Sequence, residues 1–467
     1  MLFSVEEVLK VTGGRLWRGE PEGSFSGAVI DSRKAGSGEL FFPLRGEKEN
    51  GHNFIADALL RGANGSLIEE EESSRFAGSP FPSGKTLIVV KNSLESLQKL
   101  AAYHREKFSL PVIAVTGSNG KTTTKDFIAS VLATRYNVLK TEGNLNNHLG
   151  LPLMLLRLKK EHQAAVLELG MNAPGEIALL TSLCRPNLGI ITNIGEAHLG
   201  LLGSKKNIAR AKGELLANMD PRGKAFLNGD DPFLKQLGQE FPGRTFYYGF
   251  SAETDLRVLS FCTDQAGTEF TALLPDGSTE DFRISLPGRH NVYNALAAIA
   301  VGLDFSLTNR EIREGLLSAS FSGMRMEKKL LKSGFWVIND AYNANPTSMK
   351  SSLQSLKEMA GNNTKIAVLG DMFELGATAE EKHYKLGKVL VDTGVDYLIG
   401  VGKLMEFTAE GAREAGLPRE RIFLSTTHTE ALKFLDCLDL RGAYILIKGS
   451  RAMGMEVIAE ELIKKYG

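Results

Sequence analysis

The chain of 467 residues is predicted to be an α/β protein of three domains. A usual domain size of about 150 residues allows roughly three domains in this length. Two observations give the fold class: strand and helix patterns alternate from about residue 85, and a second region of this kind begins after residue 320. We expect a small α/β domain over residues 1–84, a central parallel-sheet domain over 85–320 and a Rossmann-like domain over 321–467.

Composition and charge exclude several classes of protein. Lys plus Arg and Asp plus Glu both number 55, and the sequence has no basic stripe, so nucleic acid is not an expected partner. Acidic residues stand near the start, where a signal peptide needs basic ones, and no apolar stretch is long enough to span a bilayer. We expect a cytoplasmic monomer without membrane insertion, whose cysteines (Cys184, Cys262, Cys437) are reduced, small buried residues.

Short local patterns predict the elements of the first region. Residues 3–9 and 56–60 have the pattern of short helices. Residues 28–33 and 40–44 are predicted strands, and the first of them leads into a turn. Residues 69–84 are acidic and then rich in Ser, Pro and Gly, which is typical of an exit loop or linker.

The central region alternates between strand and helix patterns. The predicted strands are Thr86–Val90, Val112–Thr116, Ala165–Leu169, Leu188–Asn193 and Ala225–Asn228. Such alternation favours a parallel sheet with helices on both faces. Residues 254–286 change to short alternating segments with turn signals, which predict an antiparallel flank, and an alanine-rich helix follows over 291–303.

The last region is predicted to be a second doubly wound domain. Its apolar strands each end in a polar cluster, at residues 339–340, 369–371, 401–402 and 447–450. Ligands of open α/β sheets bind beyond the carboxyl ends of the strands, so these clusters are candidate ligand contacts.

A glycine loop is the strongest functional signal in the sequence. Residues 112–125 run from a buried-strand pattern through Thr-Gly-Ser-Asn-Gly-Lys-Thr into a helix pattern. Gly117 and Gly120 let backbone N–H groups face an anion, Lys121 reaches terminal phosphates, and Thr122 offers a hydroxyl to Mg²⁺. The loop is shorter than the common P-loop, because Val115 stands where that pattern has its first glycine. The sequence therefore predicts nucleotide phosphate binding.

Further polar residues follow the other predicted strands. Glu168 closes an apolar run, which favours a role in binding Mg²⁺ or positioning water over that of a solvated loop carboxylate. His198 is nearly as well explained as a structural histidine, and Lys212 by itself has the pattern of an ordinary surface lysine. Asn291 and Asn294 lie three apart on one helix face, where they either cap the helix or contact a purine edge.

Four motifs carry a resemblance to a known family. They are Asp31-Ser-Arg, Thr141-Glu-Gly-Asn-Leu-Asn-Asn, Asp340-Ala-Tyr-Asn-Ala-Asn-Pro-Thr-Ser-Met and Gly370-Asp-Met-Phe-Glu-Leu-Gly. With the glycine loop, and in order along the whole chain, they resemble the Mur ligases, ATP-dependent amide-forming enzymes of peptidoglycan precursor synthesis. The resemblance is to the branch that adds D-alanyl-D-alanine to UDP-N-acetylmuramoyl-tripeptide, since the Asp-Asn-Pro-Arg motif of the diamino-acid-adding branch is absent from the sequence.

The resemblance implies roles for individual residues. The ATP contacts it implies are Gly117, Ser118, Asn119, Gly120, Lys121, Thr122, Thr123, Asn291, Asn294, Arg325 and Asp340. Thr122, Glu168 and His198 resemble the magnesium set for two ions, and Lys212 resembles a lysine that CO₂ carbamylates so that it helps to hold the second ion. The substrate contacts it implies are Ser32, Arg33, Gly46, His52, Asn144, Asn146, Asn147, Tyr342, Asn343 and Asp371. His148 departs from the family pattern, which often has an acidic residue there, and this departure concerns local substrate contacts.

The implied reaction is a ligation through an acyl phosphate, with Lys121, Glu168, His198 and Lys212 as the catalytic set. The first domain would then bind the uridine nucleotide, the central domain ATP, and the third domain the dipeptide. Three alternatives remain: another amino-acid-adding ligase of this family, folylpolyglutamate synthetase, and a P-loop kinase or ATPase switch. The synthetase would need folate and glutamate, and a kinase or switch would turn over ATP without an amine acceptor.

Overall fold

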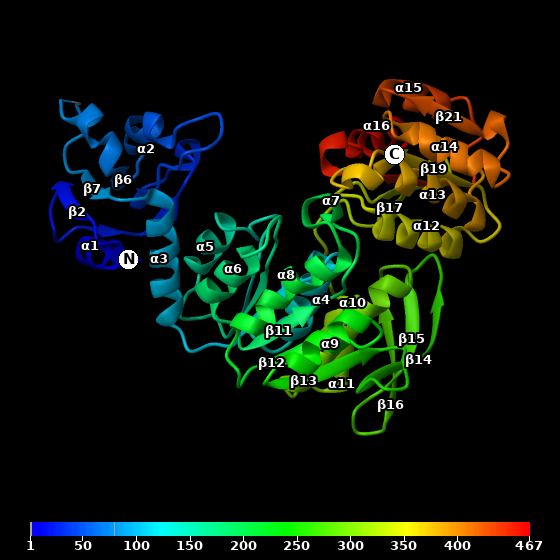
Figure 1. Cartoon of the computed structure of the whole chain (residues 1–467), viewed down its shortest axis with the longest axis horizontal. Helices are drawn as coiled ribbons and strands as arrows, with labels where there is room; N and C mark the ends of the chain where they lie inside the picture. The colour runs from blue at the N-terminus through cyan, green and yellow to red at the C-terminus, as the bar shows by residue number, and fades with distance from the viewer. Residues whose placement is uncertain (1, 79) are drawn as a thin grey trace. The chain divides into compact units, whose positions relative to one another are not determined.

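The computed structural model describes residues 2–78 and 80–467 (Figure 1). The chain divides into two compact units. Unit 1 contains Met1–Val112, Asn137–Met171 and Glu176–Pro186, and unit 2 contains Ile113–Tyr136, Asn172–Gly175 and Asn187–Gly467. Both units combine helices with mainly parallel strands, so the predicted α/β class is confirmed.

A five-stranded sheet forms the N-terminal part of unit 1. Its strands, in spatial order, are β2 (Arg15–Arg18), β7 (Thr86–Val90), β6 (Gly65–Glu69), β5 (Glu39–Phe41) and β4 (Gly27–Val29). Strands β4 to β7 run parallel, and β2 is antiparallel to β7. The helix α2 (Ile55–Leu60) contributes Ile55 and Leu59 to the apolar core beneath this sheet.

The structure corrects three expectations in this region. Residues 3–4 do not begin a helix, because they form β1 (Phe3–Ser4), which pairs with β3 (Ser24–Phe25), and Ser4 then caps α1 (Val5–Thr12). Glu69 ends the buried strand β6, which was not predicted, and residues 70–76 form a 3-10 helix rather than an open linker. Strand β7 belongs to this sheet and not to the strands of the following region.

The remainder of unit 1 contains three helices and two strands. These are α3 (Ser93–Glu106), α5 (Gly150–Leu155), α6 (Glu176–Cys184), β9 (Val138–Lys140) and β10 (Ala164–Glu168). Strands β9 and β10 are parallel. Helix α3 is tied to its neighbours by buried side chains: His104 lies 3.0 Å from the Leu158 carbonyl, and Arg105 donates to the Cys184 carbonyl.

The central strands of unit 2 form a sheet that starts parallel and ends antiparallel. They are β8 (Val112–Thr116), β11 (Leu188–Ile191), β12 (Lys224–Asn228), β13 (Arg244–Gly249), β14 (Leu256–Thr263), β15 (Thr268–Leu273) and β16 (Thr279–Ile284). Neighbours from β8 to β14 are parallel, and β14 to β16 are antiparallel, which confirms the flank predicted over residues 254–286.

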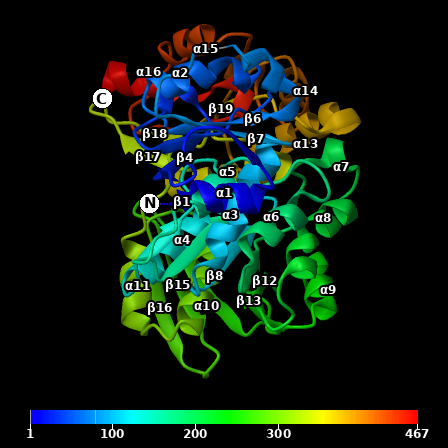
Figure 2. The same cartoon turned by 90° about the vertical axis from the view of Figure 1, so that its left-hand side faces the viewer.

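Helices cover both faces of these strands. Figure 2 shows α8 (Lys205–Asn218) and α9 (Pro232–Glu240) on one face. On the other face are α4 (Lys121–Ala133), α10 (Arg289–Asp304) and α11 (Asn309–Leu317). The short helix α7 (Leu199–Leu202) lies in the loop between β11 and α8.

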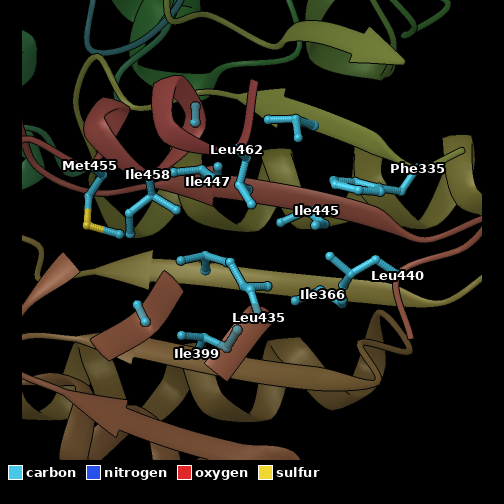
Figure 3. Packing of buried hydrophobic residues seen from close by; sticks show 14 of the residues in the cluster. Phe335, Ile366, Ile399, Leu435, Leu440, Ile445, Ile447, Met455, Ile458 and Leu462 are labelled. Atoms are coloured by element: carbon cyan, nitrogen blue, oxygen red, sulfur yellow. The ribbon is translucent and has the colours of Figure 1, made fainter. Parts of the chain in front are cut away.

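The C-terminal part of unit 2 is a second doubly wound sheet, as predicted. Its strand order is β17 (Glu327–Leu330), β18 (Trp336–Asn339), β22 (Tyr444–Lys448), β19 (Lys365–Gly370), β20 (Tyr397–Val401) and β21 (Ile422–Ser425), with only β17 antiparallel. The helices are α12 (Pro346–Ala360), α13 (Ala379–Asp392), α14 (Met405–Glu414), α15 (His428–Leu435) and α16 (Glu456–Tyr466). Figure 3 shows Ile458 and Leu462 of α16 packed against Ile445 and Ile447 of β22.

Two further observations concern expectations from composition. Within residues 2–78 and 80–467, every helix is either too short or too polar to pass through a lipid bilayer. Cys184 is buried, as expected, and burial raises the pKa of its thiol to about 12. The expectation was wrong for Cys262 and Cys437, which are exposed.

Candidate active site

The glycine loop lies between β8 and α4, at a point where two parallel strands end side by side. Since β8 and β11 are neighbours in register, the segments that follow them, residues 117–120 and 192–198, emerge at the same edge of the sheet. Gly117 has a φ of 144°, and a Cβ there would lie 1.9 Å from Thr192 Oγ1. Gly120 has a φ of 80°, and its Cβ would lie 2.4 Å from Asn294 Oδ1. Both positions therefore require glycine.

Thr192 and Asn193 hold the loop in place. The Ser118 amide donates to the Asn193 carbonyl (2.9 Å), and the Asn119 amide donates to Asn193 Oδ1 (3.1 Å). Thr192 Oγ1 donates to the Asn119 carbonyl (2.6 Å). Sequence reasoning missed both residues as functional candidates, although they directly follow the strand next to β8. They fix the backbone whose N–H groups would face an anion.

The loop side chains have the features of a phosphate site. Lys121 Nζ donates to the Gly117 carbonyl (2.9 Å), so the ammonium lies across the loop. Thr122 and Thr123 are buried at the start of α4. Among the described residues, Ser118 Oγ and Asn119 Nδ2 are buried without a hydrogen-bond partner, and buried polar groups normally have one. An oxyanion with several acceptor oxygens fits this set of donors.

Lys212 carries a buried amine that has no acidic partner among the described residues. The residue is only 1% exposed on α8, which contradicts the alternative of an ordinary surface lysine. Burial, and then the charge of Lys121, lower the pKa of its amine well below the usual value. No carboxylate of residues 2–78 or 80–467 forms an ion pair with it. A neutral amine beside a phosphate loop is the species that can react with CO₂, because protonation removes the nucleophilic lone pair.

In unit 1, Glu168 ends β10 with one carboxylate oxygen unused. The residue is 2% exposed, its Oε1 accepts from Asn146 Nδ2 (2.8 Å), and its amide donates to Thr141 Oγ1 (2.9 Å). Its Oε2 is buried without a hydrogen-bond partner among the described residues. A buried, unshared carboxylate oxygen is a suitable ligand for Mg²⁺. Within residues 2–78 and 80–467, no three His, Cys, Asp or Glu side chains gather as a metal site.

His198 contacts Glu374, which lies in the motif Gly370–Gly376 of the last domain. It has a φ of 62° just before α7, and its Nδ1 lies 2.8 Å from Glu374 Oε2. The imidazole beside it lowers the pKa of the Glu374 carboxyl. The Gly200 amide also donates to the Glu374 carbonyl (2.8 Å). Sequence reasoning used the motif Gly370–Gly376 for its resemblance but did not identify Glu374 as a site residue.

Asn291 and Asn294 form a buried pair at the start of α10. Gly288 is the N-cap of this helix and no side chain caps it, so the capping alternative was wrong. Asn294 Nδ2 donates to Asn291 Oδ1 (3.0 Å), and Thr124 Oγ1 donates to Asn294 Oδ1 (3.1 Å). The pair therefore joins α10 to the helix that follows the glycine loop.

The candidates after β18 are held by contacts within the last domain. Asp340 Oδ2 accepts from Lys448 Nζ and Ser352 Oγ (2.6 Å each), and its Oδ1 accepts from the Met326 amide. The Arg325 guanidinium lies 4.0 Å from the centre of the Tyr342 ring, a cation–π contact. Asp340 thus anchors the loop that carries the other candidates.

Asn343 follows β18 and Asp371 follows β19, two strands of the same sheet that have β22 between them. Asn343 is exposed, and its Oδ1 accepts from the Ala344 amide (2.9 Å). Asp371 is buried, which raises the pKa of its carboxyl, and its Oδ1 makes no hydrogen bond within the described residues. Backbone N–H groups of residues 403–405 contact the carboxylate, so only this one oxygen is without a partner in the described structure. A desolvated carboxylate oxygen of this kind is a feature of ligand sites.

A cavity of about 1030 Å³ lies in unit 1 and collects most of the predicted nucleotide-sugar contacts. Ser32, Arg33, Gly46 and also His148 line it. Arg33 pairs with Asp31 (2.8 Å), which lowers the pKa of that carboxyl to about 2. His148, the residue that departs from the family pattern, therefore lines this cavity.

Of the remaining predicted contacts in unit 1, His52 and Asn147 are hydrogen-bonded to groups of the protein itself. His52 is 1% exposed and does not line the cavity: its Nε2 accepts from the Glu69 amide (3.0 Å), and its Nδ1 lies 2.9 Å from Asn50 Oδ1. Asn147 Oδ1 accepts from the amides of Leu149 and Gly150, at the start of α5. Asn144 is exposed.

Comparisons with known proteins identify the family. Family models match three consecutive regions: the Mur ligase family catalytic domain at residues 24–105, the Mur ligase middle domain at 115–302, and the Mur ligase glutamate ligase domain at 324–451. The chain is 40% identical to UDP-N-acetylmuramoyl-tripeptide–D-alanyl-D-alanine ligase of Bacillus subtilis over 438 residues, covering 94% of this chain and 93% of the relative. The chain belongs to the Mur ligase family.

Solved structures agree with this assignment of a Mur ligase. A crystal structure of MurF from Acinetobacter baumannii is 33% identical, with a TM-score of 0.89 and 99% of each chain covered. MurF ligase from Thermotoga maritima in complex with ADP is 27% identical, with a TM-score of 0.82 and coverage of 94% of this chain and 97% of that chain. The predicted family and its three-domain architecture are confirmed.

Proposed function

We propose that this Mur ligase joins D-alanyl-D-alanine to UDP-N-acetylmuramoyl-tripeptide and uses ATP, which it converts to ADP and phosphate. The observation that carries the proposal is the similarity, over 94% of the chain, to a relative with that name. The glycine loop supports the use of ATP, since Gly117 and Gly120 leave no room for side chains and Lys121 lies across the loop.

Residues 117–123 are proposed to bind the phosphates of ATP. Lys121 would contact the terminal phosphates, and Asn291 and Asn294 would face the adenine, with Arg325 and Asp340 reaching the nucleotide from the last domain. Two donors of the loop, Ser118 Oγ and Asn119 Nδ2, support this role because they are buried without partners in the described structure.

Thr122, Glu168 and His198 are proposed to hold Mg²⁺. The buried Oε2 of Glu168 supports this assignment because it has no hydrogen-bond partner among the described residues. When bound, Mg²⁺ would neutralise phosphate charge and so reduce the repulsion between ATP and the peptide carboxylate. Two ions are proposed, with the phosphates supplying the remaining ligands.

Lys212 is proposed to be carbamylated. Its amine is buried, has a lowered pKa and has no acidic partner among the described residues, so it is nucleophilic toward CO₂. Carbamylation would convert this neutral amine into an anion, whose charge would be attracted to that of Lys121. A resonance from labelled bicarbonate that appears in the wild-type protein and is absent in Lys212→Gln would test this assignment by NMR.

The proposed chemistry has two steps. The terminal carboxylate of the tripeptide attacks the γ-phosphorus of ATP, which forms an acyl phosphate and releases ADP. The amine of D-alanyl-D-alanine then attacks the acyl carbon, which forms the amide and expels phosphate. The chain contributes mainly by holding the reactants together and by placing Lys121 where negative charge collects.

The three domains are proposed to divide the substrates as the sequence predicts. Residues 1–84 would bind the uridine nucleotide through Ser32, Arg33 and the loop with Gly46, and the cavity in unit 1 supports this. Asn144, Asn146 and Asn147 would contact the same substrate. Residues 85–320 would bind ATP, and residues 321–467 would bind the dipeptide near Tyr342, Asn343 and Asp371. We also propose that the enzyme acts in the cytoplasm as a monomer.

The test is phosphate release with each substrate omitted in turn. The assay would contain ATP, Mg²⁺, D-alanyl-D-alanine and UDP-N-acetylmuramoyl-tripeptide with either meso-diaminopimelate or lysine as third residue. We expect release only when both the tripeptide and the dipeptide are present. Release without an amine acceptor would indicate a kinase or ATPase instead, and release with folate and glutamate would indicate a folylpolyglutamate synthetase.

A further inference from the structure

Glu374 is a residue of the last domain that contacts a candidate metal ligand of the central domain. Its Oε2 lies 2.8 Å from His198 Nδ1, which is hydrogen-bond distance. Nδ1 is buried and has no fully formed hydrogen bond to any other group of the described structure. His198 is well covered, with 16% of its side chain exposed, so few other groups can compete for this nitrogen.

Backbone geometry holds the two residues at this separation. The Gly200 amide donates to the Glu374 carbonyl at 2.8 Å. A Cβ at Gly200 would lie 2.6 Å from the Gly376 nitrogen and 2.8 Å from the Glu374 carbonyl oxygen, so the two segments touch. Both His198 and Glu374 have a φ of 62°, an unusual conformation for residues other than glycine. Such conformations persist only where the surrounding contacts enforce them, and they cluster at functional sites.

A second pair of charges supports the same contact. Lys382 of α13 donates to Glu196 Oε1 at 2.8 Å, two residues before His198. Among the described residues, the last domain thus contacts the loop 195–200 through a backbone hydrogen bond, a lysine and a carboxylate. Only the carboxylate faces an imidazole.

We propose that Glu374 is a positioning residue for His198: its carboxylate accepts the Nδ1 proton, which would leave Nε2 as the unprotonated nitrogen available to a metal ion. An imidazole that donates one N–H to a carboxylate is fixed in tautomer and orientation and is a stronger ligand through its other nitrogen. The inference rests on the proposed function, since that proposal makes His198 a magnesium ligand. Beyond that proposal, the last domain would supply the carboxylate, that of Glu374, which orients His198 for metal binding.

The tautomer of His198 is the first readout, and it needs neither metal nor turnover. NMR of protein with isotopically labelled histidine nitrogens, with His198→Gln used to assign the signal, reports which ring nitrogen carries the proton. We expect a protonated Nδ1 in the wild type and in Glu374→Gln, whose amide oxygen still accepts the bond. In Glu374→Ala we expect the proton to move largely to Nε2. An unchanged tautomer in Glu374→Ala would overturn the proposal.

Metal affinity is the second readout. Mn²⁺ in place of Mg²⁺ would be titrated with ADP present and no other substrate, with bound ion followed by paramagnetic resonance. Loss of a residue that orients a ligand costs about 10–100-fold in metal affinity. We expect a loss of this size in Glu374→Ala, a much smaller one in Glu374→Gln, and none in Glu380→Ala, an exposed acid on nearby α13. Equal affinity of Glu374→Ala and the wild type would refute the inference.

Two further variants separate this role from a structural one. Glu374→Ala should weaken Mn²⁺ binding no further in a His198→Ala background, because the carboxylate acts only through the imidazole. Gly200→Ala places a Cβ against the Glu374 backbone and pushes the two segments apart while leaving the Glu374 carboxylate unchanged, so it should weaken Mn²⁺ binding in the same direction. An additive loss in the double variant contradicts the proposal. Failure of the proposed function would instead show as wild-type protein that releases no phosphate with both substrates, an outcome independent of these readouts.

Discussion

Asn345 Nδ2 donates to Asn119 Oδ1 at 2.7 Å, which joins the start of α12 directly to the glycine loop. The same side chain caps its own helix, since its Oδ1 accepts from the Ser348 amide (2.9 Å). One residue of the last domain therefore has two separate roles. These roles can be tested separately because different atoms of the amide perform them.

Substitution of Asn345 should separate nucleotide binding from stability. Asn345→Ser keeps a helix-capping oxygen but cannot reach Asn119, so we expect a higher KM for ATP at nearly unchanged thermal stability. Asn345→Ala loses both contacts and should also lose about 0.5–2 kcal/mol of stability. Thr427→Ala removes the cap of α15, where Thr427 accepts from the Glu430 amide, and should lower stability without affecting KM. ATP kinetics of Asn345→Ser identical to the wild type would contradict the role of the contact.

Replacement of Gly120 should weaken nucleotide binding as well as lower the stability of the protein. Gly120→Ala places a Cβ 2.4 Å from Asn294 Oδ1 at a φ of 80°. Gly143→Ala is the matched control, because Gly143 also has a positive φ (54°) but open space around it. Each left-handed alanine costs about 1–2 kcal/mol, measured by denaturant unfolding. Only Gly120→Ala should also reduce ADP affinity in a binding titration, and equal affinities of the two variants would argue against the role of the loop.

Lys121 is expected to be essential for turnover and dispensable for folding. Loss of a preorganised group that stabilises developing charge typically costs about 10²–10³-fold in kcat. We expect at least this loss in Lys121→Ala, measured by phosphate release, with an unchanged circular dichroism spectrum. Lys107→Ala, a change of the same kind at a lysine paired with Glu7, should leave kcat unaltered. Near-normal activity of Lys121→Ala would refute the assigned role.

His383 should make the stability of the protein sensitive to acid. Its Nε2 accepts from the Met372 amide (3.0 Å), its Nδ1 lies 2.7 Å from the Ala379 carbonyl, and burial lowers its pKa below 6.5 despite the charge of Asp371. The unfolded chain thus binds a proton at a higher pH than the folded protein. The contribution of neutral His383 to the free energy of unfolding is therefore fully present above pH 6.5. It is lost as the pH falls toward the lowered pKa of the folded protein.

The measurement is the free energy of unfolding as a function of pH. One proton changes its slope by up to about 1.4 kcal/mol per pH unit. His383→Gln is neutral throughout and should flatten the slope below pH 6.5 by up to that amount. An unaltered slope in His383→Gln would mean that this ring does not resist protonation. His52, buried and with a lowered pKa, offers an independent repeat through His52→Gln.

Local sequence patterns predicted the elements that fold around the glycine loop. The strand Val112–Thr116 and the helix after the loop are found as predicted, because continuous burial and helical periodicity are visible in a single segment. The strand Gly65–Glu69 was not predicted, although all five of its residues are buried. Its Gly, Ser and Glu do not form an apolar run, and only pairing with β5 and β7 makes it a strand.

Contacts between distant segments account for what the sequence could not predict about the site. Lys212 has the pattern of a surface residue, and only the packing of α8 buries it. His52 was predicted to contact substrate, but both of its ring nitrogens face protein groups. Glu374 and Asn345 were visible as parts of motifs, yet their partners His198 and Asn119 lie far away in the chain. Motif resemblance can indicate which residues matter without indicating which side chain each one contacts.

The cavity with Ser32, Arg33 and Gly46 is formed entirely by unit 1, whereas the glycine loop belongs to unit 2. A small molecule that fills this cavity therefore has no need to imitate ATP. Such an inhibitor would compete with the nucleotide-sugar substrate proposed for this cavity and not with ATP, so a high ATP concentration in the cell would not weaken it.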